Sequence, residues 1–181
     1  MTHFGPGGRQ RGAQLRPDAE LLARLEANPL TRDMASIAIE HFGTQGDGNH
    51  FAFVGNLMST GATALVTHHG SRGLGARLYT KGMKLAERHR RELSPETLTQ
   101  NAWIPADSAD GNTYWEALQL IRDWTKGNHL VIHDQAAAKL GAKVADRFWN
   151  EHNFVFRKTD GLFYHGKGAT PAFDGLSLIH I

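Results

Sequence analysis

The sequence predicts an α+β fold in which a mixed sheet is flanked by helices. Apolar residues recur at helical spacing over residues 17–40 and 112–149. Short runs of β-forming residues beside glycine-rich turns occupy residues 41–75 and 152–173. With 181 residues, of which 40% are hydrophobic, the chain is long enough for one domain with a packed core.

Residues 1–16 are expected to form a loop-like end, because glycines crowd together there. A helix is predicted from Pro17 to about Asn28, since leucines recur at helical spacing and carboxylates lie in its first turn. Residues 31–40 carry a similar apolar spacing. The N-terminal part therefore predicts two short helices.

Two glycine-rich segments follow, residues 41–55 and 62–75, and each pairs a turn with a short apolar strand. Residues 76–92 predict a helix that is weakened by Gly82. Residues 93–109 contain prolines and predict an irregular connection.

The C-terminal half predicts two amphipathic helices and a hairpin. The helices cover residues 112–125 and about 129–149, with Gly141 as a weak point in the second. Alternating residues on either side of Asp160–Gly161 predict a β-hairpin. Residues 177–181 are expected to be a tail outside the native sequence.

Composition excludes several classes of protein. Lys and Arg total 20 against 18 for Asp and Glu, and no long run of like charges occurs, so neither an acidic tail nor a polybasic arm is expected. No apolar stretch is long enough for a membrane span or a signal peptide, which predicts a cytoplasmic protein without a membrane partner. Cysteine is absent, so any metal must be held by nitrogen and oxygen.

Histidines at strand ends are candidates for metal or phosphate chemistry. His50 follows a glycine-rich turn and begins a strand, a position that suits a metal ligand and an ordinary strand-end histidine about equally. His68 and His69 end a strand, and alternation predicts that only one of them points into a given site. The next turn offers backbone amides and Arg72 to a phosphate, with a plain glycine turn as the alternative.

Two further histidine-containing segments have different interpretations. His152 begins the predicted hairpin and Lys167 follows its end, so the two are expected to share a neighbourhood, with a polar surface hairpin as the alternative. His129 and His133 are spaced i, i+4, but the glutamate of a zinc-protease motif is missing, so helix-face packing is favoured. The strand-end histidines and nearby cations together suggest a metal-assisted reaction at a phosphate.

Four motifs occur in a fixed order. They read GTQGDGNHF at residues 43–51, HHGSRGLG at 68–75, NEHNF at 150–154 and HGKGATPAF at 165–173. Together they resemble the RtcB family of RNA-splicing ligases, also called 3′-phosphate RNA ligases. The resemblance implies that residues 1–181 form part of an RtcB-like domain, an incomplete piece of that fold.

The same resemblance implies an activity. RtcB-type ligases join an RNA 3′-phosphate or 2′,3′-cyclic phosphate end to a 5′-hydroxyl end, as in tRNA splicing and RNA repair. The implied cofactors are two Mn(II) ions, with GTP as co-substrate. RNA with those ends, GTP and an archease-like activator are the implied partners.

Functional residues carried over from the resemblance fall in the shared motifs. The implied manganese ligands are His50, His68 and His152. Arg72 and Lys167 are implied phosphate or RNA contacts. The implied GTP-binding residues are Asn49, His50, Phe51, Ala52, Phe53, His152 and Asn153.

The chain also departs from the family pattern. An Asp-x-Gly-Cys motif that supplies further metal ligands is absent, and Phe53 stands where the family usually has glutamate. The histidine that becomes guanylylated, in a His-Gly-Ala-Gly motif, and a nucleotide-contacting lysine are expected beyond Ile181. We therefore expect a central fragment that is inactive alone. A metal-dependent phosphoesterase or nucleotide hydrolase, and a non-catalytic RNA-binding remnant, are the alternatives.

Overall fold

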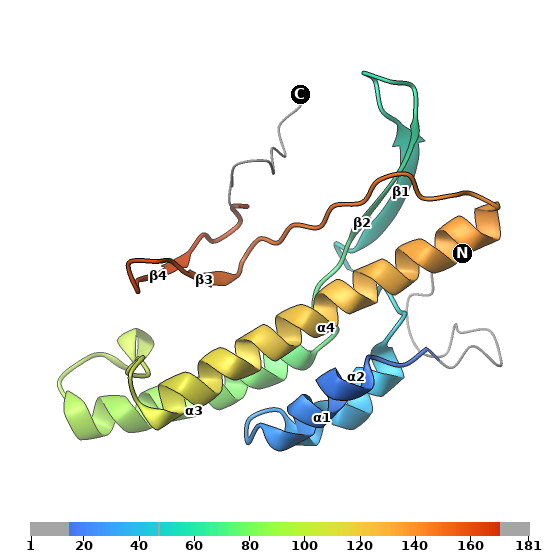
Figure 1. Ribbon diagram of the computed structural model, residues 1–181. Helices are drawn as coiled ribbons and strands as arrows, with labels where there is room; N and C mark the ends of the chain where they lie inside the picture. The colour runs from blue at the N-terminus through green and yellow to red at the C-terminus, as the bar shows by residue number, and fades with distance from the viewer. Residues whose placement is uncertain (1–14, 47, 171–181) are drawn as a thin grey trace. The chain divides into compact units, whose positions relative to one another are not determined.

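The computed structural model of the chain describes residues 15–46 and 48–170 (Figure 1). It divides into two compact units, Met1–Lys143 and Val144–Ile181. Helices dominate the first unit and short strands occur in both, which confirms the α+β class. The strands differ from the expected single mixed sheet, because the described residues form two separate two-stranded antiparallel sheets.

The first two predicted helices are confirmed. Helix α1 spans Ala19–Ala27 and begins where the Asp18 carboxylate accepts hydrogen bonds from two backbone amides of the first turn. A 3₁₀ turn, η2, covers Arg32–Met34 and leads directly into helix α2, Ala35–His41. The expected loop-like end lies outside the described residues except for residues 15 and 16, as does the expected tail at 177–181.

Helix α3, Leu74–Leu93, runs beside α4, Ala109–Leu140, with the 3₁₀ turn η3, Thr99–Asn101, in the connection between them (Figure 1). The predicted weak point at Gly82 does not interrupt α3, which is continuous through this residue. A Cβ atom on Gly82 would lie 2.5 Å from the ring of Tyr114 on α4. Glycine at this position therefore permits close packing of the two helices.

Helix α4 corrects the prediction of two helices over 112–125 and 129–149. It is one continuous helix, because Gly127 is tolerated in its interior with the Phe42 ring packed 3.5 Å from where a Cβ would lie. The helix ends at Gly141, whose left-handed φ of +63° allows its amide to cap the last turn. Residues 142–149, expected to be helical, carry no regular element.

An apolar cluster lies between the helices of the first unit. Trp124 is fully buried and its indole N–H donates to the Ala38 carbonyl at 3.0 Å. The Phe42 ring meets the Trp124 ring edge-on, with centroids 5.8 Å apart. The buried members of the cluster come from α1, η2, α2 and the residue after it, α3 and α4: Leu25, Met34, Ala38, Phe42, Leu74, Leu78, Ala117, Leu120, Ile121 and Trp124.

The hairpin of the first unit consists of β1, Phe51–Asn56, and β2, Thr63–His68. The strands are antiparallel, with Phe51 opposite His68 at one end and Asn56 opposite Thr63 at the other. Figure 1 shows the hairpin extending away from the helices. Its register brings the residues just before β1 to the end of β2.

The second unit contains the predicted C-terminal hairpin, which is confirmed. Strand β3, Val155–Arg157, pairs antiparallel with β4, Phe163–His165. The turn between them contains Gly161 at a φ of +80°, a conformation that glycine adopts at little cost. No helix in the described part of the chain combines the length and apolar character needed to cross a bilayer.

Candidate functional site

The base of the β1–β2 hairpin gathers three histidines. The ring centroids of His50 and His68 are 6.4 Å apart, and those of His50 and His69 are also 6.4 Å apart. His68 stacks on Phe51, the residue opposite it in the hairpin register, at 5.4 Å. His69 stacks instead on His129 of α4, so the two adjacent histidines have different neighbours, as strand alternation predicts.

Two glycines lie beside His50, and one of them, Gly46, is required for the close approach of its neighbours. A Cβ atom on Gly46, which has a φ of +86°, would collide with the Arg72 guanidinium and lie 2.7 Å from His50 Nδ1. A Cβ on Gly70 would lie 3.9 Å from His50 Nε2. The close approach that the glycine-rich turns suggest is therefore between parts of this chain: His50 and Arg72 meet over Gly46.

Arg72 reaches the site from the turn before α3. Its backbone adopts a positive φ of 51°, and its Nε donates to the Thr44 hydroxyl at 3.2 Å. The neighbouring Ser71 hydroxyl accepts a hydrogen bond from the Gly75 amide at 2.9 Å, which stabilises the start of α3. A guanidinium is thus placed beside an imidazole, and the expected contact of Arg72 with phosphate stays a prediction.

Helix α4 contributes two histidines that the sequence predicted to pack, and their packing is confirmed. The His129 ring lies on the His69 ring with centroids 3.4 Å apart. Its Nδ1 lies 2.9 Å from the Thr67 hydroxyl, which is also 2.8 Å from His133 Nε2. These contacts tie the end of β2 to the helix.

Burial controls the protonation of this stack. Removal from water, together with the smaller effect of the neighbouring His129, lowers the pKa of His69 to about 3. Burial likewise lowers the pKa of His129 to about 4, against the opposing effect of its hydrogen bond to the His69 carbonyl. Both rings are therefore neutral near pH 7. Strand alternation and the i, i+4 spacing were the signals for this pairing, but neither identifies the partner of His69.

Two ring nitrogens of the cluster have no hydrogen-bond partner within the described residues. They are Nδ1 of His50 and Nε2 of His69, and both atoms are buried. The His69 Nδ1 lies 3.2 Å from the Gly70 carbonyl, which can only accept, so this nitrogen carries the proton and Nε2 of the neutral ring carries a lone pair. Such a nitrogen can coordinate a metal ion or accept a hydrogen bond from a donor group.

The spacing of His50 and His68 is compatible with two ligands of one metal ion. Two imidazoles bound to one ion at about 2.1 Å place their ring centres roughly 5 to 6 Å apart, close to the spacing of His50 and His68. Three or more potential metal ligands do not converge among the described residues. The first unit therefore supplies two candidate ligands.

The remaining predicted residues around the terminal hairpin belong to the second unit. Asn153 has a φ of 56°, and its side-chain oxygen accepts a hydrogen bond from the Gly168 amide. The outer ends of the hairpin therefore meet, as predicted, and Lys167 lies in the turn that Asn153 contacts. The role of His152 as a third manganese ligand stays a prediction, as do those of Asn153 and Lys167.

The predicted GTP-binding residues of the first unit lie along the turn and strand that follow Gly48. Asn49 and Ala52 are exposed, and Phe51 and Phe53 expose 48% and 60% of their surface. The exposed Phe53 ring is available for contact with a flat base, whereas the Phe51 ring already stacks on His68. Their assignment to GTP stays a prediction.

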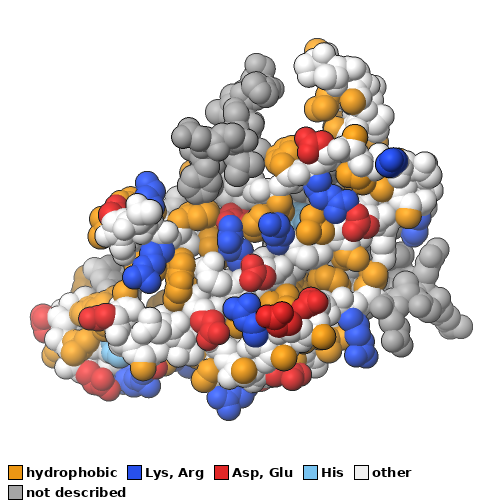
Figure 2. Space-filling model, in the orientation of Figure 1, with side chains coloured by type: hydrophobic (Ala, Val, Ile, Leu, Met, Phe, Trp, Pro, Cys, Tyr) orange, Lys and Arg blue, Asp and Glu red, His pale blue; other side chains and the backbone are white. Residues whose placement is uncertain are grey.

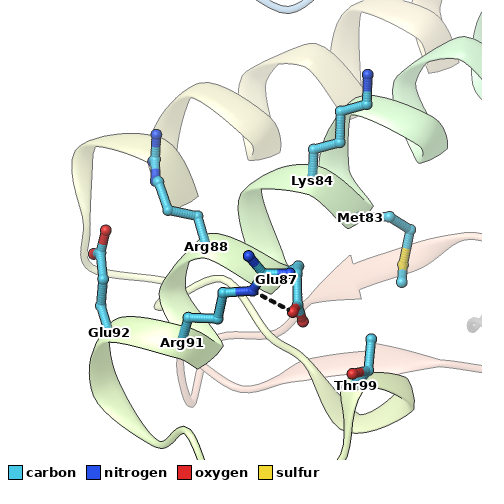
Figure 3. Close-up of a pocket in the computed structure, with 7 residues that line it drawn as sticks. All are labelled: Met83, Lys84, Glu87, Arg88, Arg91, Glu92 and Thr99. Carbon is cyan, nitrogen blue, oxygen red and sulfur yellow. Dashed lines mark hydrogen bonds and ion pairs between the residues drawn. The ribbon is translucent and has the colours of Figure 1, made fainter.

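A separate pocket of about 540 Å³ lies along α3 (Figure 3). Its charges have both signs, and the Arg91 guanidinium donates to Glu87 at 2.7 Å. Figure 2 shows the same interspersion of Lys and Arg with Asp and Glu over the visible face. None of the lining residues belongs to the histidine cluster: Met83, Lys84, Glu87, Arg88, Arg91, Glu92 and Thr99.

A guanidinium, buried imidazoles and glycine turns together are typical of proteins that bind metal ions and phosphate groups. Comparison with known proteins gives the family. The family described as tRNA-splicing ligase RtcB matches residues 13–180, so the chain belongs to the RtcB family.

Two curated relatives are similar to this chain at low sequence identity. It is 29% identical over 167 residues to a tRNA-splicing ligase RtcB of Aeropyrum pernix, covering 74% of this chain and 34% of that protein. It is 23% identical over 203 aligned positions to a tRNA-splicing ligase RtcB of Thermococcus kodakarensis, covering 96% of this chain and 40% of that protein. The chain therefore spans about a third to two-fifths of the length of these relatives.

Proposed function

We propose that this chain is part of an RNA ligase that joins an RNA 3′-phosphate or 2′,3′-cyclic phosphate end to a 5′-hydroxyl end. Mn(II) and GTP are the proposed cofactor and co-substrate. The observation that carries the proposal is the meeting of His50, His68 and Arg72 at the base of the hairpin in a chain of the RtcB family. These residues come from two of the four motifs on which the resemblance rests.

The chemistry of the residues supports a phosphate substrate. Arg72 presents a planar guanidinium that can bind two phosphoryl oxygens at once and neutralise their charge. His50 and His68 would hold manganese through ring nitrogens, with His152 as the proposed third ligand. Manganese, when bound, supplies a Lewis acid for the phosphoryl oxygens.

The surroundings of His50 support its role as a ligand. A buried ring nitrogen without a hydrogen-bond partner costs free energy unless something binds it. A bound ion would satisfy Nδ1 of His50. The neighbouring Gly46 and Gly70 keep bulky side chains away from both nitrogens of that ring.

The first test is manganese binding. Titration of the 181-residue chain with Mn(II), followed by electron paramagnetic resonance of the free ion, is expected to show saturable binding. His50→Ala and His68→Ala are expected to weaken it at least tenfold, because each removes a ligand. His89→Ala is the matched control, because that ring, near the C-terminal end of α3, contacts Asp110 in the first turn of α4 and is not part of the histidine cluster. Equal affinity in all four proteins would contradict the assignment.

The second test separates the proposed ligase from its alternatives. The motif with the guanylylated histidine is not among these 181 residues, so the chain alone is expected to bind Mn(II) without joining 3′-phosphate RNA. Joined product from this chain would contradict that expectation. Release of phosphate without GTP would favour a phosphoesterase, and RNA binding without metal binding would favour a remnant.

A further inference from the structure

A continuous chain of hydrogen bonds links α4 to both sides of His68. From the helix, His133 Nε2 lies 2.8 Å from the Thr67 hydroxyl, and that hydroxyl lies 2.9 Å from His129 Nδ1. His129 Nε2 then lies 3.1 Å from the His69 carbonyl oxygen. His129 is 8% exposed, so water has little access to these bonds.

Only one assignment of donors and acceptors satisfies every hydrogen bond in this series. The His69 carbonyl can only accept, so His129 Nε2 carries a proton and donates it. In the neutral ring, His129 Nδ1 then accepts the single proton of the Thr67 hydroxyl. The Thr67 oxygen is left to accept, so His133 donates from Nε2.

The contacts flank the predicted manganese ligand on either side in sequence. Thr67 precedes His68 and is held through its side chain, while His69 follows and is held through its carbonyl oxygen. The His69 ring adds a second contact, since it stacks on His129 at 3.4 Å. A helix thus fixes the backbone of the residues before and after His68.

We propose that Thr67, His129 and His133 are positioning residues, which set the direction of the His68 imidazole through a one-way series of hydrogen bonds. In this series His133 donates to Thr67, Thr67 donates to His129, and His129 donates to the His69 carbonyl. The proposal rests on the proposed function, because it assumes that His68 binds manganese. It assigns a role to three residues that are not among the predicted manganese ligands or phosphate contacts.

The donor-to-acceptor order of this hydrogen-bond series is tested without metal. Nuclear magnetic resonance of the ¹⁵N-histidine-labelled chain near pH 7.5 is expected to show His129 and His133 as Nε2–H tautomers. Thr67→Val, which keeps the shape but lacks the hydroxyl, is expected to change the tautomer balance of both rings and to shift the His68 ring signals. An Nδ1–H tautomer at either helix position, or unchanged His68 signals in Thr67→Val, would overturn the proposal.

The effect on the site is tested by manganese affinity. Removing a group that orients a ligand lowers metal affinity by about 10- to 100-fold, so Thr67→Val is expected to lose about tenfold. Thr67→Ser keeps the hydroxyl and is expected to retain the wild-type affinity. Equal losses in Thr67→Ser and Thr67→Val would show a packing effect and would overturn the proposal.

A second pair of variants covers the case in which Thr67→Val does not fold. His133→Gln keeps a side-chain N–H donor near the Thr67 oxygen, whereas His133→Leu does not. Stronger manganese binding by His133→Gln than by His133→Leu is expected, and equal binding would overturn the proposal. Failure of the wild-type protein to bind Mn(II) would contradict the proposed function instead. The tautomer measurement would still decide which groups of the hydrogen-bond series donate and which accept.

Discussion

The helical core and the β1–β2 hairpin of the first unit are stabilised in different ways. In the core, Trp124 and Leu25 are completely buried. In the hairpin, Phe53 exposes 60% of its surface, Val54 54% and Val66 48%. Burial of apolar area therefore accounts for the helices, whereas the hairpin depends on cross-strand pairing and on polar contacts at its base.

This difference separates stability from chemistry. None of the buried residues of the core cluster is a candidate site residue, and the polar site residues at the hairpin base contribute little apolar burial. Polar side chains of α4 connect the two regions. A substitution in the core is expected to unfold the first unit, whereas a substitution at the hairpin base is expected to alter binding first.

The largest expected effect is in the core. Trp124→Ala removes a fully buried indole and its hydrogen bond to Ala38, and is expected to lower the free energy of unfolding by about 3 to 5 kcal/mol. Phe53→Ala, the exposed aromatic counterpart in β1, is expected to cost less than about 1 kcal/mol. Urea unfolding followed by circular dichroism measures both. Similar losses would remove the distinction between the two regions.

The second prediction concerns pH. The folded pKa of His129, about 4, lies below the unfolded value of 6.5, so the unfolded chain takes up protons first as the pH falls. The stability that neutral His129 provides is therefore complete above pH 6.5 and is lost between pH 6.5 and 4. At roughly 1.4 kcal/mol per pKa unit, the loss from His129 is about 3 kcal/mol. His69 acts in the same direction.

Urea midpoints measured from pH 7.5 to pH 4 test this dependence. His129→Gln cannot take up a proton at that position, so its stability is expected to fall less steeply over the same interval. Parallel curves for the wild-type chain and the variant would contradict the burial of a neutral ring at the hairpin base.

Asn128 gives a prediction of intermediate size. Its side chain is fully buried, accepts from the Gly43 amide at 2.6 Å and donates to the Thr44 carbonyl at 3.0 Å. Asn128→Ala leaves both backbone groups without a partner and is expected to cost about 2 kcal/mol. Hydrogen exchange at the Gly43 amide is expected to accelerate. The exposed Asn101→Ala is the control and is expected to leave stability and exchange unchanged.

The smallest expected change in stability distinguishes two glycines of one turn. Gly46 and Gly48 both have a positive φ, so alanine at either is expected to cost about 1 kcal/mol. Only at Gly46 would the added methyl group meet Arg72 and His50, since nothing lies within 4 Å at Gly48. Gly46→Ala is therefore expected to weaken Mn(II) binding more than Gly48→Ala. Equal affinities would show that the turn does not shape the site.

Local patterns predicted most elements of the fold. The Asp18 cap, the strand ends at His50 and His68 and the turn at Gly161 are decided by neighbours in sequence, so periodicity and turn chemistry were sufficient to locate them. The continuity of α4 was missed. Whether glycine ends a helix or permits close packing depends on a distant partner, which is Phe42 at Gly127.

The candidate site was predictable only in part. Motif resemblance identified His50, His68 and Arg72, which the structure brings together. The stack of His69 on His129 joins residues 60 positions apart and has no local signature. The link between Thr67 and the two α4 histidines likewise requires the packing of a strand end against a helix.

The continuity of α4 from Ala109 to Leu140 has a consequence for how this protein can vary. The same helix places Trp124 in the core, Asn128 against the turn before β1 and His129 against the end of β2. Each residue of an α-helix advances the chain by about 1.5 Å and turns it by about 100°. Gain or loss of a single residue between these positions would turn the three side chains away from their partners. An insertion or deletion in this part of α4 is therefore expected to be tolerated less well than a substitution on its exposed face.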